Sequence, residues 1–104
     1  MKLMTAEIEK KLAKHPIGST ECRLDDAPVI VKYFGGCAAT WLAIEGEKEG
    51  DDWILFGKAT LDGRYWEYGT FSLKELASVK FPPFGLHVER DLYAHGTVKE
   101  LSND

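Results

Sequence analysis

Between residues 29 and 71 the chain repeats one pattern four times. Each time, a run rich in β-branched and aromatic residues is followed by a brief polar or glycine-containing stretch. The four runs are 29–34, 40–45, 53–60 and 65–71. Such residues favour β-strands, and connections this short favour antiparallel neighbours. The pair Asp62-Gly63 indicates a tight hairpin, because glycine adopts positive φ at little cost. The pattern therefore predicts an antiparallel meander.

Helices are expected on both sides of these strands. Residues 5–14 begin with a capping Thr5, carry acidic residues early and basic residues late, and stop before His15-Pro16. Two later segments, 72–79 and the end of the chain from Thr97, open with the spacing of a capping box, in which a hydroxyl and a carboxylate satisfy free backbone N–H groups.

These elements predict the α+β class. We expect a four- to five-stranded antiparallel sheet with an N-terminal helix and one or two short C-terminal helices, packed on one face. The alternating segment 86–93 is expected to form an edge strand or an extended crossing. The length suits a single domain over residues 1–104 with one core.

Both faces of the central strands carry large apolar side chains. Alternation places Leu42 and Ile44 on one face and Trp41 on the other. One face packs against helices, and we expect the other to be buried as well by curvature of the sheet. The alternative is a partly exposed aromatic patch, which would mark an interface.

Charge limits the classes of partner. The formal net charge is −4, so the chain lacks the basic excess of a nucleic-acid-binding protein, and direct nucleic-acid binding is not expected. An acidic protein can meet a basic protein partner, because complementary charge speeds encounter. No apolar stretch is long enough to span a membrane, and from the charged N-terminal segment we expect no signal sequence. We expect a cytoplasmic protein with Cys22 and Cys37 reduced.

An acidic run lies between the second and third expected strands. Five of its eight residues are carboxylates: Glu45, Glu47, Glu49, Asp51 and Asp52. One interpretation is a solvated hairpin loop. The other is a negative surface that occupies the nucleic-acid groove of a partner, since closely spaced carboxylates can imitate phosphates. The spacing of a calcium-binding EF-hand is absent.

Residues for catalysis or metal binding form no recognisable motif. The histidines and cysteines lack the short paired spacing of zinc ligands. Arg90 between Glu89 and Asp91 would favour ionised carboxylates, which suits an ion pair better than a general acid. No enzymatic activity, cofactor or metal is expected.

Aromatic and arginine residues are dense near the third and fourth strands. Arg64 and Tyr65 belong to residue types that are enriched where proteins bind one another, and Trp41 and Trp53 would join them if they are exposed. The alternative is that these strands place one aromatic face in the core.

Five segments, in order, resemble the bacterial domain-of-unknown-function family 2958. They are residues 3–12, residues 26–34, the pair Thr40-Trp41, residues 71–76 and residues 84–92. The turn at residues 35–39 departs from the family, whose members tend to have a longer polar turn there. The resemblance implies no activity or catalytic residue. It implies that such proteins are often carried on plasmids, phages and integrated elements, frequently near antirestriction genes.

Together these observations lead to one functional expectation. The chain is expected to be a mobile-element protein of the anti-CRISPR or antirestriction type, which inhibits a host defence complex (a CRISPR effector or a restriction enzyme) by protein–protein binding, with the acidic run and nearby aromatics as its surface. The alternative is a plasmid or phage accessory module that binds a small ligand or nucleic acid.

Overall fold

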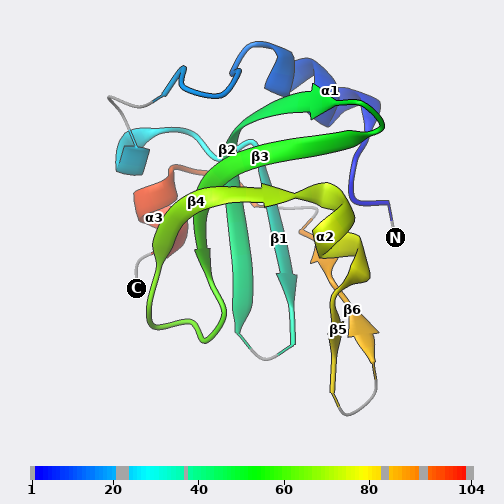
Figure 1. The fold of residues 1–104 in the computed structure, drawn as a ribbon. Coiled ribbons are helices and arrows are strands. Elements are labelled where there is room, and N and C mark those ends of the chain that lie inside the picture. The colour runs from blue at the N-terminus through cyan, green and yellow to red at the C-terminus, as the bar shows by residue number, and fades with distance from the viewer. Residues whose placement is uncertain (1, 21–23, 37, 83–84, 92–93, 103–104) are drawn as a thin grey trace.

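The computed structural model describes residues 2–20, 24–36, 38–82, 85–91 and 94–102. Cys22 and Cys37, which were expected to be reduced, lie outside these ranges, as do residues 92–93 of the expected edge segment. The α+β class is confirmed: an antiparallel five-stranded sheet is packed with short helices (Figure 1).

The large sheet has the strand order β4-β3-β2-β1-β7. Its strands are β1 (Val31–Gly35), β2 (Ala39–Glu49), β3 (Asp52–Thr60), β4 (Glu67–Ser72) and β7 (Glu89–Arg90). The first four follow one another as the expected meander. The expected strand over residues 86–93 instead forms two very short strands: β7 at the sheet edge, and β6 (Leu86–His87), which pairs with β5 (Lys80–Phe81) in a separate hairpin.

The helices begin where the sequence predicted. In α1 (Ala6–Ala13), the Thr5 hydroxyl accepts a hydrogen bond from the backbone N–H of Ile8 at 3.2 Å. In α2 (Leu73–Ser78), Ser72 and Glu75 form a complete capping box. The last helix, α3, spans Val98–Ser102, and a 3-10 turn, η1, spans Leu24–Asp26.

The sheet is covered on both faces. Ile8 and Leu12 of α1 and Leu76 of α2 pack with Trp41 and other residues of one face in the first core cluster. The opposite face carries the second core cluster, in which Leu42 and Ile44 pack with Ala27 and Val98 of the η1 and α3 regions. The expectation that all helices share one face is therefore wrong, while the expected burial of both faces is confirmed.

A β-bulge in β2 divides the sheet into two parts. The register passes from Ala43 opposite Gly57 to Glu45 opposite Phe56, so Ile44 is the additional residue. A bulge bends its strand and increases the local twist. Figure 1 shows β3 and β4 strongly curved over the sheet, with the β2–β3 turn close to α1 and the β3–β4 loop at the opposite pole.

Candidate functional site

The acidic run forms the end of a long hairpin. It was expected to be a loop, but β2 continues through Glu49, and the chain turns only at Gly50, whose φ of +63° suits a glycine. Across the hairpin Glu47 lies opposite Ile54, and Glu49 lies opposite Asp52. Glu47 and Glu49 are exposed and, two residues apart on one strand, point to the same face.

Glu45 does not belong to this surface. It is only 1% exposed, which corrects the expectation that it contacts a partner. Its Oε1 accepts a hydrogen bond from the backbone N–H of Gly18 at 2.6 Å, and its Oε2 accepts one from the backbone N–H of Thr20 at 2.6 Å. The Thr20 hydroxyl donates to the same Oε2. Through these hydrogen bonds Glu45 connects the segment that follows α1 to β2 next to its bulge.

Trp41, which was expected to contact a partner if exposed, is buried. It is 7% exposed and belongs to the first core cluster. Trp53 is half-buried and packs against the same cluster, so it remains partly accessible. The alternation that left both tryptophans as candidates could not separate them, because both lie on the same face of the sheet.

Asp52 connects the hairpin to α2. Its Oδ2 accepts a hydrogen bond from the Ser72 hydroxyl at 2.6 Å, and its Oδ1 accepts one from the backbone N–H of Lys74 at 3.1 Å. The Ser72 hydrogen bond is the largest of the effects that lower the pKa of Asp52 below its usual value. Asp52 therefore supplements the capping of α2, and its carboxylate is already engaged within the fold.

Asp51 forms an ion pair with α2. Its Oδ1 lies 2.8 Å from the Nζ of Lys74, and both side chains are largely exposed. This contact lowers the pKa of Asp51 and raises the pKa of Lys74. Because the pair is exposed, it orients the hairpin end without contributing much stability.

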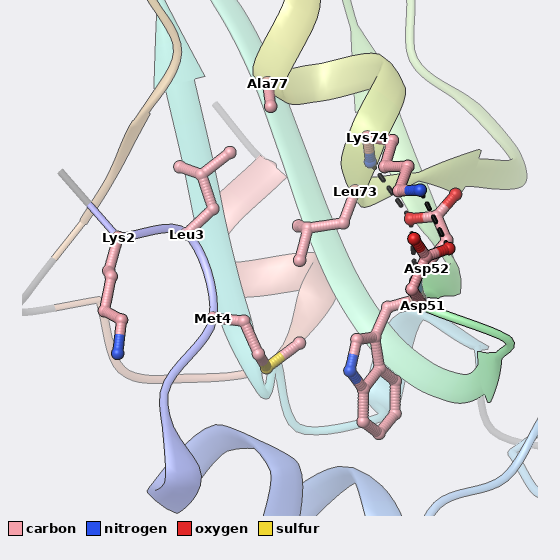
Figure 2. A pocket seen from close by; sticks show the side chains of 9 residues that line it. Lys2, Leu3, Met4, Asp51, Asp52, Leu73, Lys74 and Ala77 are labelled. Carbon is pink, nitrogen blue, oxygen red and sulfur yellow. Dashed lines mark hydrogen bonds and ion pairs between the residues drawn. The ribbon is translucent and has the colours of Figure 1, made fainter.

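A groove of about 370 Å³ borders this end of the hairpin. Figure 2 shows it between the N-terminal segment on one side and α2 on the other. Its lining is mostly apolar: Leu3, Met4, Trp53, Leu73 and Ala77, with Lys2, Asp51, Asp52 and Lys74 at the rim. Such a hollow fits an apolar side chain or a small apolar ligand.

The N-terminal wall of the groove is fixed by two hydrogen bonds. The buried Tyr33 hydroxyl donates to the backbone carbonyl of Leu3 at 2.6 Å, and Nε of Arg90 donates to the carbonyl of Lys2 at 3.0 Å. Burial raises the pKa of Tyr33, so its hydroxyl remains a neutral donor at physiological pH. The N-terminal wall of the groove is therefore held in place by contacts within the fold.

The sequence pattern of the DUF2958 family, described as a protein of unknown function, matches residues 3–103. The chain belongs to the DUF2958 family. No curated protein and no solved structure matches it. The family assignment suggested by five ordered segments is thus confirmed, while membership itself assigns no activity.

In this DUF2958 protein, Arg64 and Tyr65 lie far from the acidic hairpin end. Tyr65 was expected to begin the fourth strand, directly after Arg64, but β4 begins only at Glu67, so both residues lie in the β3–β4 loop. The nine residues of β3 separate the two regions, a span of about 30 Å for an extended strand. The structure therefore divides the expected surface into two separate regions.

A further acidic residue lies on the same sheet face as Glu47 and Glu49. Asp25 of η1 lies 3.5 Å from Nζ of Lys58 and accepts a hydrogen bond from the Tyr68 hydroxyl. That hydrogen bond is the main cause of the lowered pKa of Asp25. Since Asp25 is paired with a cation, it adds little to the negative surface.

Within the described ranges, no group of three or more His, Cys, Asp or Glu side chains could hold a metal ion. No helix there is long and apolar enough to cross a membrane.

The sequence did not indicate the groove or the role of Lys74. The capping box at Ser72 located the start of α2 correctly. The hydrogen bonds from Ser72 and Lys74 to Asp52, however, join residues that are 20 and 22 positions apart. The pairing of β3 with β4 brings these residues together, and no local sequence pattern predicts a contact over such a separation.

Proposed function

We propose that this DUF2958 protein is a non-enzymatic binding protein that inhibits a host defence complex. The complex would be a CRISPR effector or a restriction enzyme, and the contact would be made by the acidic face at the end of the β2–β3 hairpin. The protein would be encoded by a mobile element and act in the cytoplasm, where such complexes are found.

The observation that carries the proposal is the pair of carboxylates on the exposed hairpin face. Glu47 and Glu49 are exposed, share one face, and lie about 7 Å apart along the strand. Among the residues that the structure describes, neither forms an ion pair. Unpaired carboxylates at this spacing can meet the Lys and Arg side chains that line a nucleic-acid groove.

The choice of a defence complex rests on the family. The resemblance implies that DUF2958 proteins often lie on plasmids, phages and integrated elements near antirestriction genes. This supports a role against host defence by association, and the acidic face offers a physical means for it.

The test is a pull-down from a nuclease-treated bacterial lysate at about 0.15 M salt, where exposed charges are screened beyond about 8 Å. The tagged wild type is compared with E47K/E49K. The matched control is E9K/E89K, which makes the same charge change at two exposed residues of α1 and β7. Asp51 and Asp52 are left intact, because both also contact α2.

The expected result is capture of an identified CRISPR or restriction subunit by wild type and E9K/E89K, and its loss with E47K/E49K. The nuclease activity of the purified complex should then fall on addition of wild type and persist with E47K/E49K. Equal capture by all three proteins, or capture without inhibition, would contradict the proposal.

The groove favours a second candidate function, an accessory module that binds a small apolar ligand. Ala77 is exposed on α2 and lines the groove, whereas the neighbouring Ser78 is exposed and does not. The variant A77L should fill the groove and abolish ligand binding, and S78L should not. Dependence on Ala77 but not on Glu47 and Glu49 would select this candidate over the first.

A further inference from the structure

The β3–β4 loop, residues 61–66, is held in one conformation by its own hydrogen bonds. One carboxylate oxygen of Asp62 accepts from the backbone N–H groups of Arg64 and Tyr65, at 2.8 and 3.0 Å, and from the Thr60 hydroxyl at 3.1 Å. These backbone hydrogen bonds lower the pKa of Asp62, so it is ionised at neutral pH. Gly63, with φ of +81°, completes the turn.

This ordered loop presents apolar side chains to solvent. Leu61 and Tyr65 are each 77% exposed, the largest values among the exposed large apolar residues that the structure describes. Arg64, which directly precedes Tyr65 in the loop, is also exposed. Binding through a preordered loop avoids the entropy of ordering it, and Tyr and Arg are frequent anchors of interfaces.

A hollow lies beside the loop. It measures about 340 Å³ and is lined by Trp41, Ala59, Thr60, Leu61 and Glu67. The lining is mostly apolar, apart from the Glu67 carboxylate. Within the part of the chain that the structure describes, neither Arg64 nor Glu67 forms an ion pair.

One patch thus carries both members of two complementary pairs. It has a highly exposed aromatic side chain in the loop beside a hollow, and an unpaired cation three positions before an unpaired anion. In a two-fold symmetric contact, each residue i meets residue j of the partner and each j meets i. We propose that this patch, Leu61 with Arg64, Tyr65 and Glu67, is the contact between two copies of the chain.

In this dimer Tyr65 of each copy enters the hollow of the other, and Arg64 faces the partner's Glu67. The contact also lies at the start of β4, which forms one edge of the large sheet. The other edge strand, β7, is only two residues long, and so short an edge offers little for another strand to pair with. The six residues of β4 contain no Pro or Lys to protect the edge, and a second copy beside them would limit access to it.

The first test is sedimentation equilibrium from about 10 μM to about 1 mM at about 0.15 M salt, a range suited to small, weak interfaces. The expected mass rises with concentration from 11.7 kDa toward twice that value. Y65S should raise the dimer dissociation constant at least about tenfold, because it removes the anchor of both halves. L86S is the control, since Leu86 is 58% exposed but lies outside the patch.

The second test reverses the charges. R64E and E67R should each weaken the dimer at least about tenfold, because each places like charges together twice in the symmetric contact. The double variant R64E/E67R should return to within about threefold of wild type, since it restores both pairs in exchanged positions. Circular dichroism on each variant verifies that the fold is retained.

A constant mass of 11.7 kDa up to about 1 mM would overturn the proposal. So would association that Y65S leaves unchanged, or a double charge reversal as weak as its single components. None of these outcomes concerns Glu47 and Glu49, so the dimer and the proposed inhibition of a defence complex succeed or fail separately.

Discussion

At the scale of single residues, the acidic run contains residues with opposite roles. Glu45 is buried and accepts three hydrogen bonds, whereas Glu47, two positions later, is exposed. The sequence could not separate them, because the donors to Glu45 are 25 and 27 positions away. Composition alone therefore overestimated the acidic surface.

Replacing Glu45 by Gln should destabilise the protein. A glutamine has one acceptor oxygen, and its NH2 group would face the N–H of either Gly18 or Thr20. The N–H of Thr20 is buried and that of Gly18 is partly buried. One of the two would lose its partner, which costs about 1–3 kcal/mol at a buried group. Denaturant unfolding monitored by circular dichroism measures the change.

The matched control for this prediction is E47Q, made at an exposed position of the same strand. It should change the free energy of unfolding by less than about 0.5 kcal/mol. Equal stability of E45Q and E47Q would show that the buried hydrogen bonds of Glu45 contribute nothing.

At the scale of elements, the hairpin and α2 are coupled through Asp52. The helix start was predictable from Ser72 and Glu75, because a capping box is local. The additional acceptor from Asp52 was not predictable, because it depends on the pairing of β3 with β4, which brings Asp52 beside the start of α2. This coupling also holds one wall of the groove.

The lowered pKa of Asp52 predicts sensitivity to acid. A carboxyl group whose pKa is lower in the folded protein stabilises the fold above its unfolded pKa, and this contribution is lost as pH falls through the folded value. Stability should therefore decline below about pH 3.8, the ordinary value for Asp. In D52N the decline should be shallower, because one of the responsible groups no longer titrates.

Thermal unfolding between pH 7 and pH 2.5 tests this expectation. The control is E49Q, which removes an exposed carboxylate of the same hairpin and should follow the wild-type profile. If D52N and wild type lose stability in parallel throughout this interval, the hydrogen bonds of Asp52 do not favour its ionised form.

At the scale of the whole molecule, the central sheet has a core on each face. The first core cluster lies beneath α1 and α2, and the second lies beneath η1 and α3. Residues 41–46 of β2 are buried on both faces for this reason, and Leu42 of β2 and Leu55 of β3 are each 0% exposed. The short C-terminal helix is therefore part of the folded core.

Truncating either core should be costly. Leu42→Ala in the second core cluster and Leu55→Ala in the first should each lower the free energy of unfolding by about 2–5 kcal/mol, the range for buried leucines. Urea unfolding followed by tryptophan fluorescence provides the measurement. Both variants should keep a single transition, because the two cores share the same strands.

Leu86→Ala serves as the control, since Leu86 is 58% exposed on β6. Its stability should remain within about 0.5 kcal/mol of wild type. A comparably small effect of Leu42→Ala would mean that α3 and η1 cover the sheet without forming a core.

By itself the sequence determined the features that depend on local chemistry. Alternating apolar runs with short connections specify an antiparallel meander, and Thr5 and Ser72 specify helix starts, because each acts on neighbours within a few residues. The five ordered segments likewise identified the family.

Only the tertiary structure decided which faces are covered and which charges are free. Contacts with the segment after α1 buried Glu45, the packing of η1 and α3 buried Leu42, and the length of β3 separated Tyr65 from the acidic hairpin end. These features depend on contacts between residues far apart in the chain. Such contacts form only when the sheet bends and the helices pack against both of its faces.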